Sequence, residues 1–343
     1  MDNNDFSTAE IKAQKKSEMK EEFKEWFFFQ KKEFFKNVSI VKQLVIRSVK
    51  VQYRNSVIGI FWTVLNPLLN MLVMFLVFSF MFGRGGMTTE AEQNTYALYL
   101  LCGNIVFGMM RTATYQALPS IVQNRGLLTK NKMSYNVFPL ACALSAVVNF
   151  LFSFVALLGV MMFSWLVWDQ AVFGFNIFLI LVALPALFLF CYGISLVLSA
   201  LYVFFRDIMH FYNVFLTLWM YLTPIFYSPA VFDQKAEASV LAKMMQTVVK
   251  LNPMYHFVEY FRNAVYRNTV HKAELETLIV EQGLATDPQY VASIGDEIVA
   301  VQKVIESFNP VSDALLLSGI GFGALLVGAI IFMATKRKFI YSI

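Results

Sequence analysis

The chain has few of the groups that carry enzyme chemistry. It has three cysteines and three histidines in 343 residues. Cys102, Cys142 and Cys191 lie inside apolar stretches, without the spacing of a metal site or a disulfide framework, so we expect small buried hydrophobic residues. The histidines are scattered over different loops, and no Ser/His/Asp or HExxH arrangement is present. We therefore predict no catalytic residues, no metal site and no bound cofactor.

A nucleotide-binding motif is also absent. The sequence contains no G-x-x-x-x-G-K-S/T phosphate-binding loop and no polar stretch long enough for a nucleotide-binding domain. If the chain takes part in an ATP-driven process, a separate chain must hydrolyse the ATP.

Charge is scarce. Only 15% of the residues are charged while 58% are hydrophobic, and the mean hydropathy is +0.57, far from the balance of a soluble domain. The charged residues cluster at the N-terminus, in short loops and in one long segment before the last apolar stretch. The pI near 8.9 is explained by membrane topology, so we expect no nucleic-acid partner. The composition predicts an all-α integral membrane protein.

Six apolar stretches are long enough to cross a bilayer as helices, which takes about 20 residues. An even number places both termini on the same side of the membrane. The predicted spans are residues 58–82, 96–118, 138–165, 177–203, 211–227 and 314–334.

The basic residues indicate which side that is. With both termini in the cytoplasm, nineteen of the twenty-eight Lys and Arg residues fall on the cytoplasmic side, as the positive-inside rule requires. The short outer loops then hold Arg84 alone. We therefore predict a multi-pass protein of the cytoplasmic (inner) membrane.

The first 57 residues carry twelve basic and eight acidic residues, too many for a cleavable signal peptide. Within this cytoplasmic segment, residues 41–54 predict an amphipathic helix with Arg47, Lys50 and Arg54 on one face. Such a helix would lie in the membrane interface, with its cations toward anionic headgroups. A solvated helix leading into the first span is the alternative.

The segment before the last span is irregular. Residues 240–266 form two short amphipathic stretches broken at Asn252-Pro253, where proline ends a helix. This pattern predicts a re-entrant hairpin dipping in from the outer face, or else two helices lying on the surface. The acidic residues 268–311 predict a small helical insertion outside the cytoplasm.

Within the spans, Arg111 is the one formal charge away from the ends. An intramembrane arginine should face a bundle interior, a pore or a partner, so contact with an anionic substrate or a salt bridge is one interpretation. Snorkelling to the cytoplasmic end is the other. Trp62 and other aromatic residues either stack on sugar rings or form interfacial belts.

Residues 47–71, RSVKVQYRNSVIGIFWTVLNPLLNM, closely resemble the start of ABC-2 type permeases that export O-antigen, capsular polysaccharide and teichoic acid. In that family a basic amphipathic helix precedes a tyrosine, a basic residue and S-x-x-G-x-x-W-x-x-x-x-P. The matching residues here are Tyr53, Arg54, Ser56, Gly59, Trp62 and Pro67.

Three further stretches resemble the same family. Phe205, Arg206 and Asp207 match its F-R-D turn, and residues 223–227 match the motif that follows it. The second loop resembles the segment that couples to the ATPase, which implies that role for Gln123, Asn124, Arg125, Gly126, Leu127 and Lys130. The stretch LNPMYHFVEYFRNAVY resembles the outer gate, which implies that role for Asn252, Pro253, Tyr255, Glu259 and Arg262.

The resemblance covers roughly residues 41–267 and the last span. It implies a homodimeric permease that binds two copies of a separate ATPase, with ATP and Mg in that partner, and moves a lipid-linked polysaccharide outward. Arg47, Lys50, Arg54, Trp62 and Arg111 become candidates for contact with the substrate or its lipid carrier. The first 40 residues and residues 268–311 exceed the family's usual core.

Two other functions stay open at this stage. One is an ABC-2 exporter of drugs or small lipids, which would share the fold. The other is a membrane enzyme that acts on lipid-linked sugars without an ATPase.

Overall fold

The computed structural model describes residues 38–52, 59–82, 90–130, 133–168, 172–229, 240–284, 288–336 and 339. These residues are helical almost throughout, and no strand occurs among them. The prediction of an all-α protein is confirmed.

A helix over residues 38–52 precedes the bundle. The principal helices that follow are α2 (Trp62–Phe82), α4 (Tyr96–Ala117), α7 (Val137–Trp168), α8 (Ile180–Phe204), α9 (Ile208–Leu222) and α15 (Pro310–Thr335). The shorter elements are η1 (Gly59–Phe61), α3 (Glu90–Asn94), α5 (Ser120–Gln123), α6 (Arg125–Lys130), η3 (Phe175–Leu179), α11 (Val240–Leu251), α12 (Pro253–Arg262), the π-helical η4 (Asn263–Arg267), α13 (Asn268–Leu284) and α14 (Pro288–Ser307).

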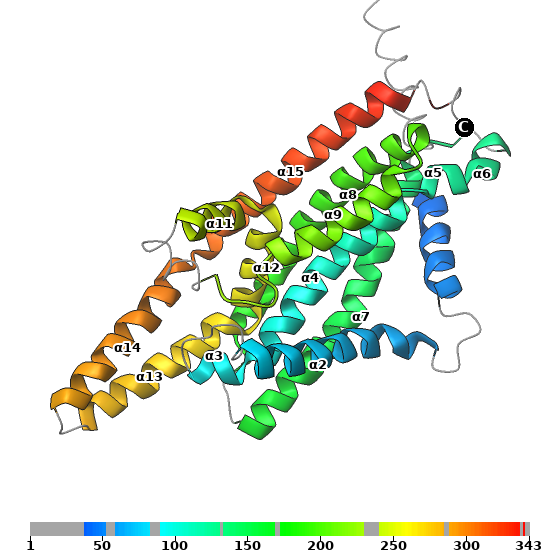
Figure 1. The fold of residues 1–343 in the computed structure, drawn as a ribbon. Helices are drawn as coiled ribbons and strands as arrows, with labels where there is room; N and C mark the ends of the chain where they lie inside the picture. The colour runs from blue at the N-terminus through cyan, green and yellow to red at the C-terminus, as the bar shows by residue number, and fades with distance from the viewer. Residues whose placement is uncertain are drawn as a thin grey trace, which may run out of the picture.

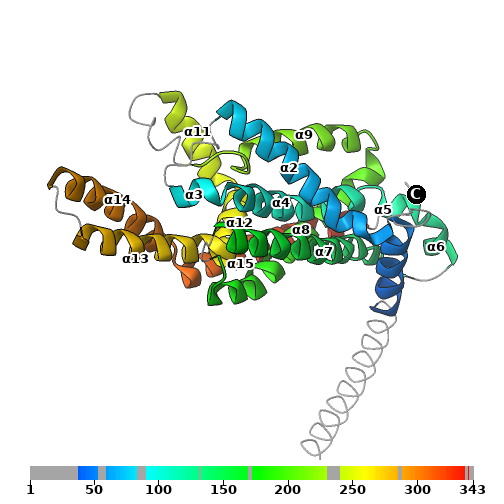
Figure 2. The ribbon, with the colours of Figure 1, turned by 90° about the horizontal axis from the view of Figure 1, so that it is seen from below.

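The long helices α4, α7, α8, α9 and α15 run alongside one another, and α2 crosses one side of this bundle obliquely (Figures 1 and 2). Helix α4 lies at the centre and contacts α2, α7, α8, α9 and α12. Helices α13 and α14 pack together and project from one end of the bundle (Figure 1). The core is therefore built around α4.

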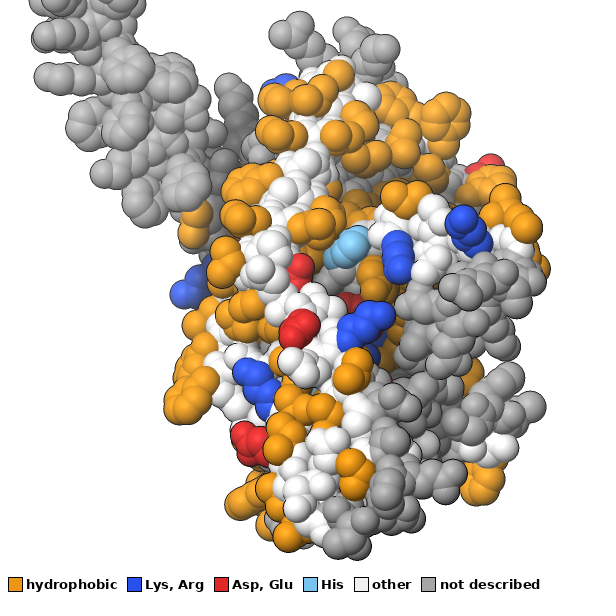
Figure 3. Space-filling view, turned by 90° about the vertical axis from the view of Figure 1, so that its left-hand side faces the viewer, with side chains coloured by type: hydrophobic (Ala, Val, Ile, Leu, Met, Phe, Trp, Pro, Cys, Tyr) orange, Lys and Arg blue, Asp and Glu red, His pale blue; other side chains and the backbone are white. Residues whose placement is uncertain are grey.

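The outside of the bundle is apolar. Large hydrophobic side chains are exposed along α2, α7, α8, α9 and α15; on α2 they are Leu69, Leu72, Val73, Leu76, Val77 and Phe80. So much exposed apolar surface is unfavourable in water and favourable in lipid. The face shown in Figure 3 is different. Lys, Arg, Asp and Glu side chains gather across its middle, below a mostly hydrophobic upper part.

Among the described residues, four helical segments are both long and apolar enough to cross a membrane: Trp62–Phe80, Val137–Val167, Phe175–Phe204 and Pro310–Thr335. Helix α4 is long enough, but it carries Asn104, Arg111 and Gln116 and lies inside the protein, so its sequence need not suit lipid. Helix α9 has 15 residues, about 22 Å at 1.5 Å per residue. It ends at Leu222, whereas the span predicted from the sequence continued to residue 227. The count of six spans is therefore not confirmed by length and hydropathy.

Helices α8 and α15 approach each other through glycine. A Cβ atom on Gly328 of α15 would collide with the backbone carbonyl of Gly193, and one on Gly193 of α8 would collide with the backbone of Ala324. Small residues allow such close backbone contact, which drives helix association in membranes. These two helices consequently form the most closely packed pair in the bundle.

The contact predicts that Gly328→Ala destabilises the protein, because a methyl group there meets rigid backbone. Overpacking of this kind costs about 1–3 kcal/mol, which should lower the thermal unfolding midpoint of the detergent-purified protein by several degrees. Gly323→Ala on the same helix is the matched control, since its Cβ has no atom within 4 Å. Equal midpoints for the two variants would contradict the packing.

Candidate functional site

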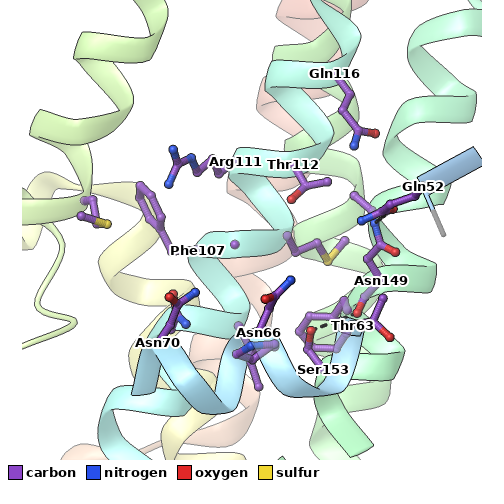
Figure 4. Close-up of a pocket in the computed structure, with 18 residues that line it drawn as sticks. Gln52, Thr63, Asn66, Asn70, Phe107, Arg111, Thr112, Gln116, Asn149 and Ser153 are labelled. Carbon is purple, nitrogen blue, oxygen red and sulfur yellow. Dashed lines mark hydrogen bonds between the residues drawn. The ribbon is translucent and has the colours of Figure 1, made fainter. Parts of the chain in front are cut away.

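A polar cavity of about 330 Å³ lies between α2, α4 and α7, with Met220 of α9 at one edge (Figure 4). We call it the amide cleft, because six carboxamide side chains line it. Its polar lining consists of Gln52, Thr63, Asn66, Asn70, Asn104, Arg111, Thr112, Gln116, Asn149 and Ser153.

Helical periodicity places these residues on facing sides of three helices. Residues three, four and seven apart share a helix face. On α2, Thr63, Asn66 and Asn70 follow that spacing, and on α7 Ala146, Asn149 and Ser153 do. The cleft is thus formed by polar stripes on otherwise apolar helices.

Helix α4 forms the back wall of the amide cleft. Between residues 98 and 117 it is buried except along one face, which carries Asn104, Gly108, Arg111, Thr112, Tyr115 and Gln116. In Figure 4, Arg111 and Phe107 extend to one side of α4, while Gln116 and Asn149 lie on the other. The open face of α4 therefore presents both amides and a cation.

The cleft has hydrogen-bonding capacity that the described residues do not use. Asn149 donates from Nδ2 to Oε1 of Gln52 over 3.4 Å, but its buried Oδ1 has no hydrogen-bond partner among the described residues. Arg111 is exposed in the cleft, and the part of the chain that the structure describes offers its guanidinium group no hydrogen bond or ion pair. These groups are open to a polar ligand.

A second cavity, of about 540 Å³, adjoins the first; we call it the interface pocket. Arg47 and Ser48 of the N-terminal helix line it, as do Gln123 and Asn124 at the end of α5. It shares two lining residues, Gln52 and Gln116, with the amide cleft. The two cavities therefore adjoin at these residues, and together they extend from the N-terminal helix to α4.

The helix over residues 38–52 is amphipathic as predicted, but part of its apolar face meets protein. Val41 is buried, and Leu44 and Val45 pack with it against the start of α7, where Val137 and Ala141 lie. Lys42, Arg47 and Lys50 are exposed. Arg47 lines the interface pocket and Lys50 does not; Arg54 lies outside the described residues. Trp62 begins α2 and lines neither cavity.

The predicted coupling residues lie at the end of the bundle that holds the N-terminal helix (Figure 1). Gln123 ends α5, and Arg125, Gly126, Leu127 and Lys130 belong to α6. Asn124 joins the two short helices: its side chain donates to the carbonyl of Ser120, and its own carbonyl accepts from the Leu127 amide. Residues 120–130 thus form a compact corner directly beside the interface pocket.

Three of the predicted gate residues, Asn252, Pro253 and Tyr255, lie at the hinge between α11 and α12. The side-chain oxygen of Asn252 accepts from the Met254 amide and caps α12, with Pro253 in its first turn. The same oxygen accepts from Nε1 of Trp219 at 2.8 Å, and Nδ2 of Asn252 donates to Thr223 at 2.9 Å. Asn252 therefore ties the end of α9 to this hinge. Tyr255 lies in the first turn of α12.

A buried charge cluster lies beyond the hinge. Glu259 pairs with Arg262 and with Arg267, each at 2.7 Å, and Arg267 also pairs with Glu92 at 3.0 Å. His271 lies 3.0 Å from Glu274 and 3.7 Å from Glu92. We call these six residues the outer charge cluster.

Arg262 is fully buried, and each of its three guanidinium nitrogens donates at least one hydrogen bond. It donates to the carbonyls of Tyr99 and Ile225, and its Cζ lies 3.3 Å from the centre of the Tyr99 ring. A Cβ on Gly103 would come within 2.9 Å of the guanidinium, so α4 needs glycine there. Arg262 therefore holds α12, α4 and the chain after α9 together.

Electrostatics in the cluster favour the charged form of Arg267. Burial alone would lower the pKa of Arg267, but the carboxylates of Glu259 and Glu92 raise that pKa above its usual value. Glu259 accepts a charge-assisted hydrogen bond from each arginine. The cluster is a set of matched ion pairs.

Sequence reasoning that searched for formal charges in the spans missed most of the amide cleft. Asn66, Asn70, Asn104 and Asn149 were not predicted as site residues. Their signal is a carboxamide repeated at helical spacing inside an apolar stretch, as at residues 66 and 70. Glu92 was missed because its partners, Arg267 and His271, are far away in the sequence. Arg267 was missed because it follows directly after the stretch LNPMYHFVEYFRNAVY, on which the gate prediction rests.

Fold and cleft together define a multi-pass membrane protein with a polar cavity between its helices. The family model of the ABC-2 type transporter matches residues 40–266, which is more than half of the chain. The chain belongs to the ABC-2 type transporter family, as a membrane-spanning permease.

Curated relatives are similar over most of their length. The O-antigen export system permease protein RfbA of Myxococcus xanthus is 28% identical over 248 residues, which are 71% of this chain and 86% of the relative. Two proteins of the same name from Klebsiella pneumoniae are 22% and 24% identical, over 66% and 64% of this chain and 79% and 78% of their own.

The outer charge cluster predicts that Glu259→Gln is strongly destabilising, because fully buried Arg262 loses its anionic partner. Breaking a buried pair from one side costs roughly 3–5 kcal/mol, so the unfolding midpoint should fall well below that of wild type. Lys243→Gln, at an exposed position on α11, is the control. A Glu259→Gln variant as stable as this control would mean that the pair does not hold the outer end.

Proposed function

We propose that this chain is the permease of an ABC exporter that moves a lipid-linked polysaccharide out across the cytoplasmic membrane. The observation that carries the proposal is the amide cleft. A carboxamide has two donors and two acceptor lone pairs, so it can match sugar hydroxyls in many orientations. Six such groups, with three hydroxyl side chains, suit a hydrated polymer that must slide.

The polar lining of the amide cleft also argues against the first alternative function, an ABC-2 exporter of drugs or small lipids. Drug-sized ligands bind in pockets lined mainly by apolar and aromatic groups, and cationic ones need a carboxylate. Among the described residues, no Asp or Glu lines the amide cleft or the interface pocket. The names of the curated relatives, O-antigen export permeases, point in the same direction as the cleft.

The proposed topology has six crossings, with α4 and α9 counted as spans and both termini in the cytoplasm. Helix α4 qualifies because neighbouring helices enclose it. Helix α9 is short, and the seven residues after it are held against α4 by Tyr96 and Tyr99, whose hydroxyls donate to the carbonyls of Phe226 and Tyr227. In this topology α11 and α12 form a re-entrant hairpin on the outer side, and α13 and α14 lie outside the membrane.

A second copy of the chain would complete the path. Apolar side chains are exposed on α9, including Phe211, Val214, Phe215 and Leu218, and on α2, which forms one wall of the cleft. We propose a homodimer in which these helices face those of the partner, so that two half-clefts form one channel.

The energy would come from two copies of a separate ATPase, which binds ATP and Mg and docks beneath α5 and α6. Because Gln123 and Asn124 line the interface pocket, a movement of this corner changes the cavity next to the amide cleft. This arrangement connects ATP hydrolysis to the substrate path.

Replacing cleft amides should abolish export without unfolding the protein. The double variant Asn66→Leu/Asn104→Leu removes hydrogen-bonding groups from two walls, and we expect at least a ten-fold loss of surface polysaccharide in a cell that depends on this permease. Val327→Ala, at an exposed position on α15, is the control. Normal export by a stably folded double variant would contradict the proposed path.

The partner can be tested directly. The chain is produced together with the ATPase encoded beside it, purified and reconstituted, and ATP hydrolysis is measured with and without lipid-linked glycan. We expect stimulation by the glycan, and its loss when Gln123, Asn124 and Arg125 are replaced by alanine. A stable complex indifferent to glycan would favour a drug or lipid exporter, whereas activity on lipid-linked sugars without any ATPase would favour the membrane enzyme.

A further inference from the structure

Phe339 is completely buried, although it lies beyond the last helix of the bundle. Helix α15 ends at Thr335, and Phe339 comes four residues later with 0% of its surface exposed. In the sequence it follows three basic residues, Lys336, Arg337 and Lys338. Burial removes the large apolar surface of its ring from water, so the chain after α15 is held against the bundle at this point.

Three aromatic rings from three different segments contact Phe339. The ring centroids of Phe332 on α15 and Tyr135 before α7 each lie 5.5 Å from that of Phe339, at interplanar angles of 77° and 83°. Phe204, the last residue of α8, lies at 5.9 Å and 51°. The first two contacts have the edge-to-face geometry that aromatic pairs favour. Phe339 therefore ties the ends of α15 and α8 to the residues just before α7.

The same hydrophobic cluster includes the corner beneath which we propose that the ATPase docks. Ile121 of α5 is fully buried in this cluster, and Val122 of α5 and Leu128 of α6 pack against it. The end of α15 lies at the same end of the bundle as α5 and α6 (Figure 1). We call this set the anchor cluster, and its buried members are Ile121, Leu196, Ala200, Val203, Phe332 and Phe339.

The corner depends on tertiary contacts for its shape. Helix α5 has four residues and α6 has six, and helices this short are not stable by themselves in water. Helices α8 and α15 offer a rigid support, because a Cβ atom on Gly193, Gly321 or Gly328 would collide with facing backbone. The anchor cluster thus joins two short helices to the most closely packed pair of the bundle.

We infer that Phe339 is a positioning residue for ATPase docking: by filling the anchor cluster, it holds α5 and α6 in the orientation that the ATPase binds. The inference rests on the proposed function and adds to it a residue outside the docking corner that sets the affinity for the partner. Without the Phe339 ring the corner samples further orientations, and the apparent affinity falls with the fraction that is competent to dock. Once the ATPase is bound, it selects that orientation itself, so turnover in the complex does not depend on Phe339.

The test compares Phe339→Ala, which removes the ring, with Phe339→Leu, which keeps a large apolar side chain. Tyr135→Ala removes one of the rings around Phe339 from a half-buried position and serves as a second disrupting variant. Met333→Ala, at an exposed position near the end of α15, is the control.

Each full-length chain is reconstituted in nanodiscs, and three quantities are measured. Hydrogen/deuterium exchange of residues 120–130 reports on the corner, with residues 252–262 as the internal reference. Titration with the ATPase encoded beside the chain gives the dissociation constant of the complex. The rate of ATP hydrolysis is then measured with the chain saturated by the ATPase.

We expect Phe339→Ala to raise the dissociation constant by about ten-fold, which is the change if the docking-competent fraction falls to about one tenth. Exchange of residues 120–130 should become faster, because their local opening becomes easier. Exchange of residues 252–262 and the rate of the saturated complex should stay at the wild-type level. Tyr135→Ala should act in the same direction as Phe339→Ala, Phe339→Leu should restore most of the affinity, and Met333→Ala should match the wild type.

Unchanged exchange of residues 120–130 in both disrupting variants would overturn the inference, and so would an unchanged dissociation constant. Equally faster exchange of residues 252–262 would also overturn it, because it would reveal a general loss of stability. The proposed function fails in a different way. If the wild-type chain forms no complex with the ATPase, the exporter and the docking role are both removed, whereas a wild-type complex that neither variant weakens removes the docking role alone.

Discussion

The enclosure of α4 is the constraint on which the rest of the structure depends. Lipid cannot hydrogen-bond to polar groups, so a helix that carries Asn104, Arg111 and Gln116 must be surrounded by protein. Helices α7 and α8 cover two sides of α4, and α12 covers its outer end. The remaining face is left open to a polar cavity, where water or a ligand can satisfy those groups. The polar path and the shape of the bundle thus have one cause.

At the outer end the same constraint has a different solution. Arg262 lies within the protein with 0% of its side chain exposed, and isolated burial of such a charge would cost several kcal/mol. Glu259 and the carbonyls of Tyr99 and Ile225 compensate that cost. Because these partners come from α12, α4 and the chain after α9, satisfying one charge also fixes the relative positions of three segments. The polar groups at this end form hydrogen bonds and ion pairs within the protein, whereas those in the cleft are available for binding.

Much of this fold is predictable from the sequence, and the failures have physical reasons. Long apolar stretches gave α2, α7, α8 and α15, because length and hydropathy suffice for a helix that faces lipid on one side. Helix α4 was also found, although its composition is that of an enclosed helix. The end of α9 was placed too late, because residues 223–227 are apolar but leave the helix at Pro224 and bind to α4 instead. The break at Asn252-Pro253 was visible because proline and an N-cap residue act locally. The assembly of the amide cleft was not visible, since α2, α4 and α7 each contribute only two or three uncharged polar residues, which the packing brings together.

The distribution of packing also separates a rigid half of the bundle from an adaptable one. Helices α8 and α15 touch backbone to backbone at Gly193 and Gly328, and such interlocked contacts cannot slide without collision. On the opposite side, α9 buries only Tyr212 and Leu216 among its described residues, and α2 crosses α4 and α7 obliquely with a polar cavity between them. A change in the width of the cleft is therefore easier through α2 and α9 than through α8 and α15. Because Asn252 and Trp219 tie the end of α9 to the hinge of α11 and α12, a shift of α9 also moves this hinge, so the hinge follows any movement of α9 beside the amide cleft.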